Sequence, residues 1–386
     1  MDWNKIMYYD NKINSLKQIF GMEDIHLQKD AVEVRGRRYP IIDDVIILSE
    51  PGEYTDKVKK ILGEKSLIPI PAQVNLAAQG AAAARGRSRS AGFSKDIQDT
   101  FGMEWGKYSK IMASHGEEFA KYFDIVDIES LRGARVCDLG CGIGRFSYFL
   151  KDICGEIMLV DFSDAIFEAR KNMSGADNCL FFMGDLTKLP FTANYADFLF
   201  CLGVLHHLPR PALEEVRKLK KSAHRVLVYL YYALDNKAFY FKWILSVVTL
   251  FRRRLSKSKS AFLRSVIPPL GARFVYFPLV LLGGMLERFK MSRFIPLYDS
   301  YRGKGIKRIE QDVYDRFFTS IEQRFERKNI MKLKDTFDSV TVSDNVPYWH
   351  FLCRGNEVPD EALSGASGPC EIRRISRCES REAGRN

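Results

Sequence analysis

The chain has 386 residues, of which 46% are hydrophobic and 28% are charged. These proportions are typical of a folded soluble protein and exclude a largely disordered chain. The net charge of +11 favours anionic partners such as nucleic acid, a phosphorylated substrate or an acidic membrane surface. No apolar signal-peptide core follows Met1, and no apolar run reaches about 18 residues. We therefore expect a cytoplasmic protein without a membrane-spanning helix.

The eight cysteines form no C-x-x-C pair, and five lie in or beside apolar runs. We interpret them as small buried thiols in a reducing compartment. A zinc site or a disulfide framework is the alternative. The cysteines are Cys137, Cys141, Cys154, Cys179, Cys201, Cys353, Cys370 and Cys378.

Residues 1–70 predict a small β module. Residues 31–35 alternate apolar and polar side chains, and the apolar runs 41–42 and 45–48 flank a turn at Asp43-Asp44. Residues 71–96 are rich in Ala, Gly and Arg with no periodic apolar face, which is typical of a linker.

Residues 97–131 predict a helix that opens the next part of the chain. Phe101, Trp105 and Tyr108 recur at helical spacing and share one face. The helix either packs on the core or forms a lid over a ligand, and the two roles are compatible.

Short apolar strands alternate with helical stretches around 145–152, 164–172 and 211–221. This alternation predicts an α/β fold with a doubly wound, mostly parallel sheet of seven strands. We assign residues 97–235 to its first part, 236–320 to a helical insertion, 321–355 to its C-terminal strands and 356–386 to a disordered tail. The expected strands are 136–139, 156–161, 179–183, 195–202, 225–232, 337–343 and 348–353.

The segment 136–146 carries the strongest functional signal. A strand ends near Asp138, and Gly140, Gly142 and Gly144 then alternate with other residues before a predicted helix. Alternate glycines let the backbone turn sharply and approach a ligand, and the helix start offers N–H groups to a carboxylate. Arg145 replaces the last glycine of the dinucleotide fingerprint, and an acid before the loop would repel a pyrophosphate but attract an ammonium group.

Acids follow the next two strands at the same edge of the sheet. Asp161 ends the second strand and is suited to accept hydrogen bonds from two ribose hydroxyls, with Phe162 beside an adenine. Asp185 and Leu186 follow the third strand, where Asp185 is suited to the adenine amino group. Ligands of open α/β sheets lie beyond these strand ends, so the spacing predicts one shared site.

These successive motifs resemble those of class I S-adenosylmethionine-dependent methyltransferases, and most closely their small-molecule branch, which includes quinone methylases. The resemblance covers roughly residues 100–232. It implies a Rossmann-like methyltransferase fold with S-adenosylmethionine as the cofactor and no metal. The implied cofactor-binding residues are Asp138, Gly140, Cys141, Gly142, Gly144, Asp161, Phe162, Asp185, Leu186 and Leu202.

A second, smaller resemblance concerns the N-terminal module. Residues 36–48 resemble the zinc-ribbon-like domain found beside some methyltransferases, but no cysteine precedes Cys137. We therefore expect a metal-free module that is held by packing.

Methyl transfer from a sulfonium mainly requires alignment and shielding from water, so a base matters only for an acceptor that must lose a proton. His206 and His207 follow the fourth strand, and either could be this base or a structural residue that shapes the pocket. Further polar candidates are Asp312, Tyr314, Asp315 and the segment 348–350.

The insertion has an unusual composition, because no acid lies between Asp235 and Glu287 while nine Lys or Arg residues do. The apolar runs 243–250 and 274–282 flank the cluster 252–254. This pattern fits either a helical cap on the core or peripheral contact of residues 236–286 with an anionic membrane at its inner face. Nucleic acid is the less expected partner, because the neighbouring runs are aliphatic.

The sequence therefore predicts a methyltransferase acting on a small-molecule or lipid-linked acceptor, such as a glycan or quinone intermediate. RNA methylation is one alternative, although Cys201-Leu-Gly-Val stands where base-amine methylases carry an N-P-P-Y-type tetrapeptide. A non-catalytic binding module that keeps the fold is the other alternative, and the intact loop and acids count against it.

Overall fold

The computed structural model describes residues 8–63, 95, 97–102, 109–258 and 260–355. The predicted tail at 356–386 and all of the predicted linker except Lys95 lie outside these ranges, as do Trp105 and Tyr108 of the predicted aromatic face. The described cysteines are all buried free thiols, while Cys370 and Cys378 fall in the undescribed tail.

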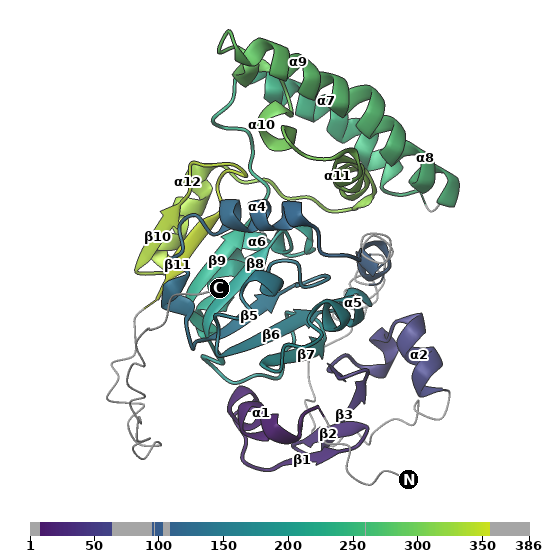
Figure 1. Ribbon diagram of the computed structural model, residues 1–386, viewed down its shortest axis with the longest axis vertical. Helices are drawn as coiled ribbons and strands as arrows, with labels where there is room; N and C mark the ends of the chain where they lie inside the picture. Colours follow the sequence, from purple (N-terminus) through teal and green to yellow (C-terminus); the bar gives the residue numbers. More distant parts are fainter. Residues whose placement is uncertain (1–7, 64–94, 96, 103–108, 259, 356–386) are drawn as a thin grey trace, which may run out of the picture. The chain divides into compact units, whose positions relative to one another are not determined.

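One mixed sheet organises the fold, with the strand order β1-β2-β3-β4-β7-β6-β5-β8-β9-β11-β10 (Figure 1). Neighbours from β4 to β9 run parallel, and β11 is antiparallel to both β9 and β10. The chain order reverses at β5, the place where open α/β sheets bind ligands. The seven strands expected from the sequence are β5 Arg135–Leu139, β6 Glu156–Asp161, β7 Cys179–Met183, β8 Ala196–Leu202, β9 Ala223–Tyr229, β10 Ser339–Val342 and β11 Phe351–Arg354.

The sheet has eleven strands rather than the predicted seven, because the N-terminal module extends it. Its strands are β1 Ile25–Gln28, β2 Ala31–Val34, β3 Arg37–Ile42 and β4 Val45–Ile47. Residues Asp43 and Asp44 both have positive φ, as a tight two-residue hairpin requires. Because β7 is apolar and buried along its whole length, its free edge needs a partner, and the fully buried β4 pairs with it in parallel.

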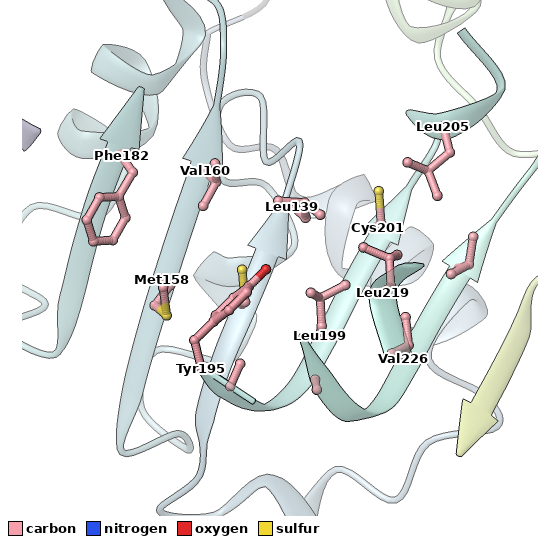
Figure 2. Packing of buried hydrophobic residues seen from close by; sticks show 14 of the residues in the cluster. Leu139, Met158, Val160, Phe182, Tyr195, Leu199, Cys201, Leu205, Leu219 and Val226 are labelled. Atoms are coloured by element: carbon pink, nitrogen blue, oxygen red, sulfur yellow. The ribbon is translucent and has the colours of Figure 1, made fainter. Parts of the chain in front are cut away.

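Helices cover both faces of the sheet, as a doubly wound fold requires. Alternate residues along β6 belong to opposite cores: Met158 and Val160 pack on one face, and Ile157 and Leu159 on the other. Figure 2 shows the first of these cores. That face is covered by α1 Ile13–Phe20, α6 Ala212–Lys218 and α12 Arg327–Ile330, and the other face by α2 Asp56–Leu62, α4 Ala113–Tyr122 and α5 Ala165–Asn172.

Two predicted helices near the site are shorter than expected. The stretch 145–152 contains only the 3-10 turn Ser147–Phe149, and a bond from the Ser147 hydroxyl to the Asp138 carboxylate, 2.7 Å long, ties this turn to the end of β5. The stretch 97–131 is divided into residues 97–102, α4 and a 3-10 turn Glu129–Leu131, and the extended backbone of Met112 begins α4.

The insertion is helical, as predicted. It contains α7 Phe239–Leu255, α8 Ala261–Gly271, the π-helical turn η8 Ala272–Tyr276, α9 Phe277–Glu287, α10 Tyr298–Tyr301 and α11 Ile306–Phe318. The sequence predicts no helix that could span a membrane. By length and composition, this prediction was wrong. Residues 261–287 join α8, η8 and α9 into one apolar helix of 27 residues, because Pro268 and Pro269 do not interrupt it.

Candidate active site

A cavity of about 660 Å³ opens at the carboxyl ends of the parallel strands. Its volume lies within the range of pockets that enclose small-molecule ligands. The structure brings together ten of the twelve residues predicted to bind the cofactor or act as the base, while Gly144 and His206 do not line the cavity. The ten are Asp138, Gly140, Cys141, Gly142, Asp161, Phe162, Asp185, Leu186, Leu202 and His207.

The glycine loop combines strained backbone with close packing. Gly140, Gly142 and Gly144 all have positive φ, which favours glycine over other residues. A Cβ on Gly140 would lie 2.4 Å from Cγ2 of Val204, so this position is closed to side chains. A Cβ on Gly144 would lie 3.1 Å from the Leu159 side chain. Gly144 therefore serves the packing of the loop on β6 rather than the cavity wall.

Asp161 fastens the glycine loop to the end of β6. One carboxylate oxygen accepts the Gly142 N–H at 2.9 Å, and the other accepts the N–H and hydroxyl of Ser163 at 2.9 and 2.7 Å. Burial raises the pKa of the Asp161 carboxyl, although the bonds from Ser163 and Gly142 oppose the rise. A carboxylate has about four acceptor positions, so these bonds already occupy most of them.

Asp138 is the second buried acid and lies at the end of β5. Its carboxylate accepts the Ser147 hydroxyl at 2.7 Å. Burial is the main cause that raises the pKa of Asp138 to about 7, and the Ser147 bond opposes it. A buried carboxylate on a cavity wall favours a cationic ligand group, which would restore the stability of its charged form.

The third acid is less buried and lies beside the N-terminal module. One oxygen of Asp185 accepts the N–H and hydroxyl of Thr187 at 2.9 and 2.8 Å. Lys188 lies 3.7 Å from Asp185 and binds Glu53 at 2.6 Å. Glu53 also lines the cavity, so the N-terminal module contributes directly to this wall.

The two adjacent histidines occupy different environments. His206 is fully buried with no hydrogen-bond partner among the described residues, and its ring stacks on Tyr231 with centroids 3.9 Å apart. Burial, followed by the charge of His207, lowers the pKa of His206 well below its ordinary value. His206 is therefore a packing residue and not a base at the cavity.

His207 lines the cavity. Its Nδ1 lies 2.7 Å from the Ile321 carbonyl oxygen, which can only accept, so Nδ1 carries the proton in the neutral ring. The other nitrogen, Nε2, is buried without a hydrogen bond in the described part of the chain and lies 3.9 Å from the Asp315 carboxylate. Phe101 contributes a neighbouring ring, with centroids 5.5 Å apart.

The far wall of the cavity comes mostly from residues that the sequence did not single out. Helix α11 presents Arg308, Gln311, Asp312, Asp315 and Arg316, whose spacing places them on one helix face. That polar periodicity was the signal available in the sequence. Of the further polar candidates named from the sequence, Asp312 and Asp315 line the cavity, whereas Tyr314 and 348–350 do not. The other lining residues of this wall are Glu118, Lys121, Tyr122, Tyr229, Tyr231, Tyr232, Ser300, Tyr301, Lys304 and Arg324.

Glu118 joins three elements around this wall. Its buried carboxylate pairs with Arg308 at 2.9 Å, Lys304 at 3.2 Å and Arg145 at 3.3 Å. Burial alone would raise the pKa of Glu118, but Arg308, Arg145 and Lys304 together lower it well below its ordinary value. The cluster therefore ties α4 and α11 to the residue that follows the glycine loop.

No group of three or more His, Cys, Asp or Glu side chains could hold a metal ion in the ranges that the structure describes. Arg316 lines the cavity, and no described carboxylate forms an ion pair with it. The cavity-lining side chains within the two ranges 118–122 and 300–324 include five cations and three carboxylates. This half of the cavity therefore favours an anionic ligand group, and the half at the strand ends favours a cationic one.

The central part of the chain is similar to known methyltransferase domains. Residues 136–228 match the family model of a methyltransferase domain. A curated relative, phosphoethanolamine N-methyltransferase 3 of Arabidopsis thaliana, is 27% identical over 105 residues. The match covers 26% of this chain and spans about a fifth of the relative's length, 21%.

Solved structures with similar folds include two methyltransferases. Phosphoethanolamine N-methyltransferase 1 of Haemonchus contortus, solved with phosphoethanolamine and S-adenosylhomocysteine, is 20% identical with a TM-score of 0.30, covering 34% of this chain and 31% of that one. Magnesium protoporphyrin IX methyltransferase of Synechocystis PCC 6803, solved with S-adenosylhomocysteine, is 19% identical with a TM-score of 0.32, covering 41% and 79%.

Proposed function

We propose that this chain transfers a methyl group from S-adenosylmethionine to a small-molecule or lipid-linked acceptor. The observation that carries the proposal is the convergence of the glycine loop and three acids on one cavity within a matched methyltransferase domain. Asp138, Asp161 and Asp185 lie at or just beyond the carboxyl ends of three neighbouring strands and line the same cavity.

The residues present fit this cofactor. S-adenosylmethionine supplies an electrophilic methyl group on a sulfonium and carries an ammonium group, so it is cationic where it would meet Asp138. The Asp161 carboxylate lies on the cavity wall where a ribose hydroxyl could donate to it, and Asp185 suits the adenine amine. Leu186, Phe162 and Leu202 supply apolar surface around a base. Gly140 keeps the backbone close to the ligand, because any side chain there would meet Val204.

The other half of the cavity selects the acceptor. Arg316 offers a guanidinium that forms no ion pair with a carboxylate among the described residues, and Tyr122 and Tyr232 supply aromatic surface to the same cavity. This combination suits a polar or phosphorylated head group on a body with apolar character. A glycan or quinone intermediate, either as a small molecule or linked to a lipid, is the acceptor class that we propose.

His207 is the residue placed to remove a proton from a hydroxyl acceptor. Its Nδ1–H is fixed by the Ile321 carbonyl, so the lone pair of the neutral ring lies on Nε2. Asp315 lies 3.9 Å from that nitrogen and would stabilise the charged ring after proton transfer. The Tyr231 hydroxyl donates to the other oxygen of Asp315 at 2.5 Å and so holds this carboxylate in place.

Isothermal titration of the full chain with S-adenosylmethionine and S-adenosylhomocysteine tests the proposal. Asp161→Ala should weaken binding at least tenfold. Asp164→Asn is the matched control, because Asp164 binds Thr55 at 2.6 Å and does not line the cavity. Absence of binding by the folded wild-type chain, or equal loss in both variants, would contradict the assignment.

A further inference from the structure

The insertion exposes an extensive apolar surface. Of the large hydrophobic side chains that are exposed in the described residues, all but Ile61 and Met112 lie between Phe239 and Phe294. We call these residues of α7, α8, η8, α9 and the following loop the apolar helical surface. They are Phe239, Trp243, Leu250, Phe251, Phe262, Leu270, Phe274, Val275, Phe277, Leu281, Leu282, Met285, Phe289, Met291 and Phe294.

Helix α9 differs from a core helix, because most of its apolar side chains are exposed although one side packs closely on the protein. Its sequence FPLVLLGGMLE is apolar on every side, yet Gly283 is its only buried residue. A Cβ on Gly283 would lie 2.2 Å from the Tyr298 ring, so one side of α9 packs closely on the protein. Met285 is 74% exposed and Phe274 in the preceding turn is 73% exposed. Exposed apolar areas of this extent mark an interaction site.

Unpaired basic residues border the apolar helical surface. Arg253, Arg254 and Lys257 are exposed at the end of α7, and Arg288 and Lys290 are exposed after α9. No ion pair joins any of these five side chains to a described carboxylate. Apolar side chains bordered by Lys and Arg match the two layers of an anionic membrane, where acyl chains lie beneath negative head groups.

We propose that the apolar helical surface docks on an anionic lipid bilayer. The charge pattern favours this partner over a second copy of the chain, because pairing two copies would bring like charges together. The proposal concerns peripheral contact, although the helix 261–287 is long enough to cross a membrane.

The contacts of that helix with α11 explain why it would lie on the membrane surface rather than cross the membrane. Arg273 pairs with Glu310 at 2.7 Å, and Ala272 and Tyr276 are buried against Ile309 and Val313 of α11. A spanning helix would need lipid or apolar partners on every side and would place this ion pair in hydrocarbon, which is costly.

Helix α11 connects the docked surface to the cavity. Its residues Ile309 and Val313 face η8, while Arg308, Asp312 and Arg316 line the cavity. Docking would therefore hold one wall of the cavity beside the bilayer. The inference does not depend on the proposed methyl transfer, but together they favour an acceptor that resides in the membrane.

Vesicle flotation with the full chain tests the proposal at low salt. The wild type should float with vesicles of phosphatidylcholine and phosphatidylglycerol and much less with phosphatidylcholine alone. Phe274→Glu should abolish flotation, whereas Ile61→Glu should not, because Ile61 is exposed outside this surface. Arg253→Gln with Arg254→Gln should lower partitioning about thirtyfold.

Lys59→Gln with Lys60→Gln on α2 is the matched control for charge and should leave flotation unchanged. Urea unfolding checks the fold of each variant. Titration with S-adenosylmethionine separates the two proposals, since cofactor binding and flotation can fail independently. Docking is refuted by wild-type chain that stays with the soluble fraction, or by equal losses in Ile61→Glu and Phe274→Glu. Docking is also refuted if the wild type sediments as a dimer and binds no vesicles, and if Phe274→Glu converts that dimer to a monomer.

Discussion

Replacing the Asp138 carboxylate with an amide should stabilise the free protein while removing a cofactor contact. Asp138 is 4% exposed, and burial raises its pKa from an ordinary value of 3.8 to about 7. An acid whose pKa is raised on folding contributes stability that is fully present below the ordinary pKa. That contribution is lost as pH rises through the folded value.

The size of the effect follows from those two pKa values. Linkage of one such group predicts that the wild type loses about 2.6 kcal/mol of unfolding free energy between pH 5 and pH 8 through Asp138. Asp138→Asn lacks this loss and still offers an oxygen to the Ser147 hydroxyl. Its stability relative to the wild type should therefore rise by about 2–3 kcal/mol across the same interval.

Urea unfolding of both proteins at pH 5 and pH 8, without ligand, measures this difference. All other titrating groups are shared, so they cancel in the comparison. A variant whose relative stability stays constant or falls between the two pH values would refute the account of Asp138. Binding of a cationic cofactor should also expel the Asp138 proton below pH 7, which calorimetry in buffers of different ionisation enthalpy detects as proton release.

Three further predictions concern the same cavity. Glu118→Gln should lower the unfolding free energy at pH 7 by about 3 kcal/mol in urea titration, because three cations lose their shared partner. Because the pKa of Glu118 is lowered in the folded protein, its carboxylate contributes to the unfolding free energy. The wild type should lose this contribution as the pH falls below 4.5, the ordinary pKa of a glutamate side chain. Gly140→Ala should weaken cofactor binding at least tenfold in calorimetry, with unchanged affinity contradicting the contact with Val204. His207→Gln should preserve cofactor affinity but lower kcat about 100-fold on a hydroxyl acceptor, and unaltered turnover would exclude it as the base.

Local patterns in the sequence were sufficient to predict most residues that line the cavity at the strand ends. The glycine loop, Asp161 and Asp185 each follow a strand within a few residues, and the strands themselves are continuous apolar runs. Parallel strands then bring their carboxyl ends to one edge without any long-range information. The hydrogen bonds of Asp161 within the protein were less predictable, and Ser163 and Gly142 already occupy most of its acceptor positions.

Features that depend on distant pairing could not be predicted in the same way. The sequence indicated a β module before residue 70, but nothing local states that β4 pairs with β7 and extends the sheet. The long apolar helix was missed because Arg264 and Arg273 divide its apolar runs in the sequence. In the structure Arg273 is directed to Glu310, and Arg264 donates to the Tyr314 hydroxyl at 3.2 Å.

Three of the polar groups that burial makes unfavourable lie at the cavity. Asp138 and Asp161 are buried acids with raised pKa values, and Nε2 of His207 is buried without a partner. Each arrangement is unfavourable in the free chain, and a ligand with a cationic group and hydroxyls would relieve the two acids. Natural sequences tolerate such local conflicts mainly where function requires them. The stability that Asp138→Asn should gain therefore measures how much unfolding free energy the free protein loses by keeping a buried carboxylate that can bind a cation.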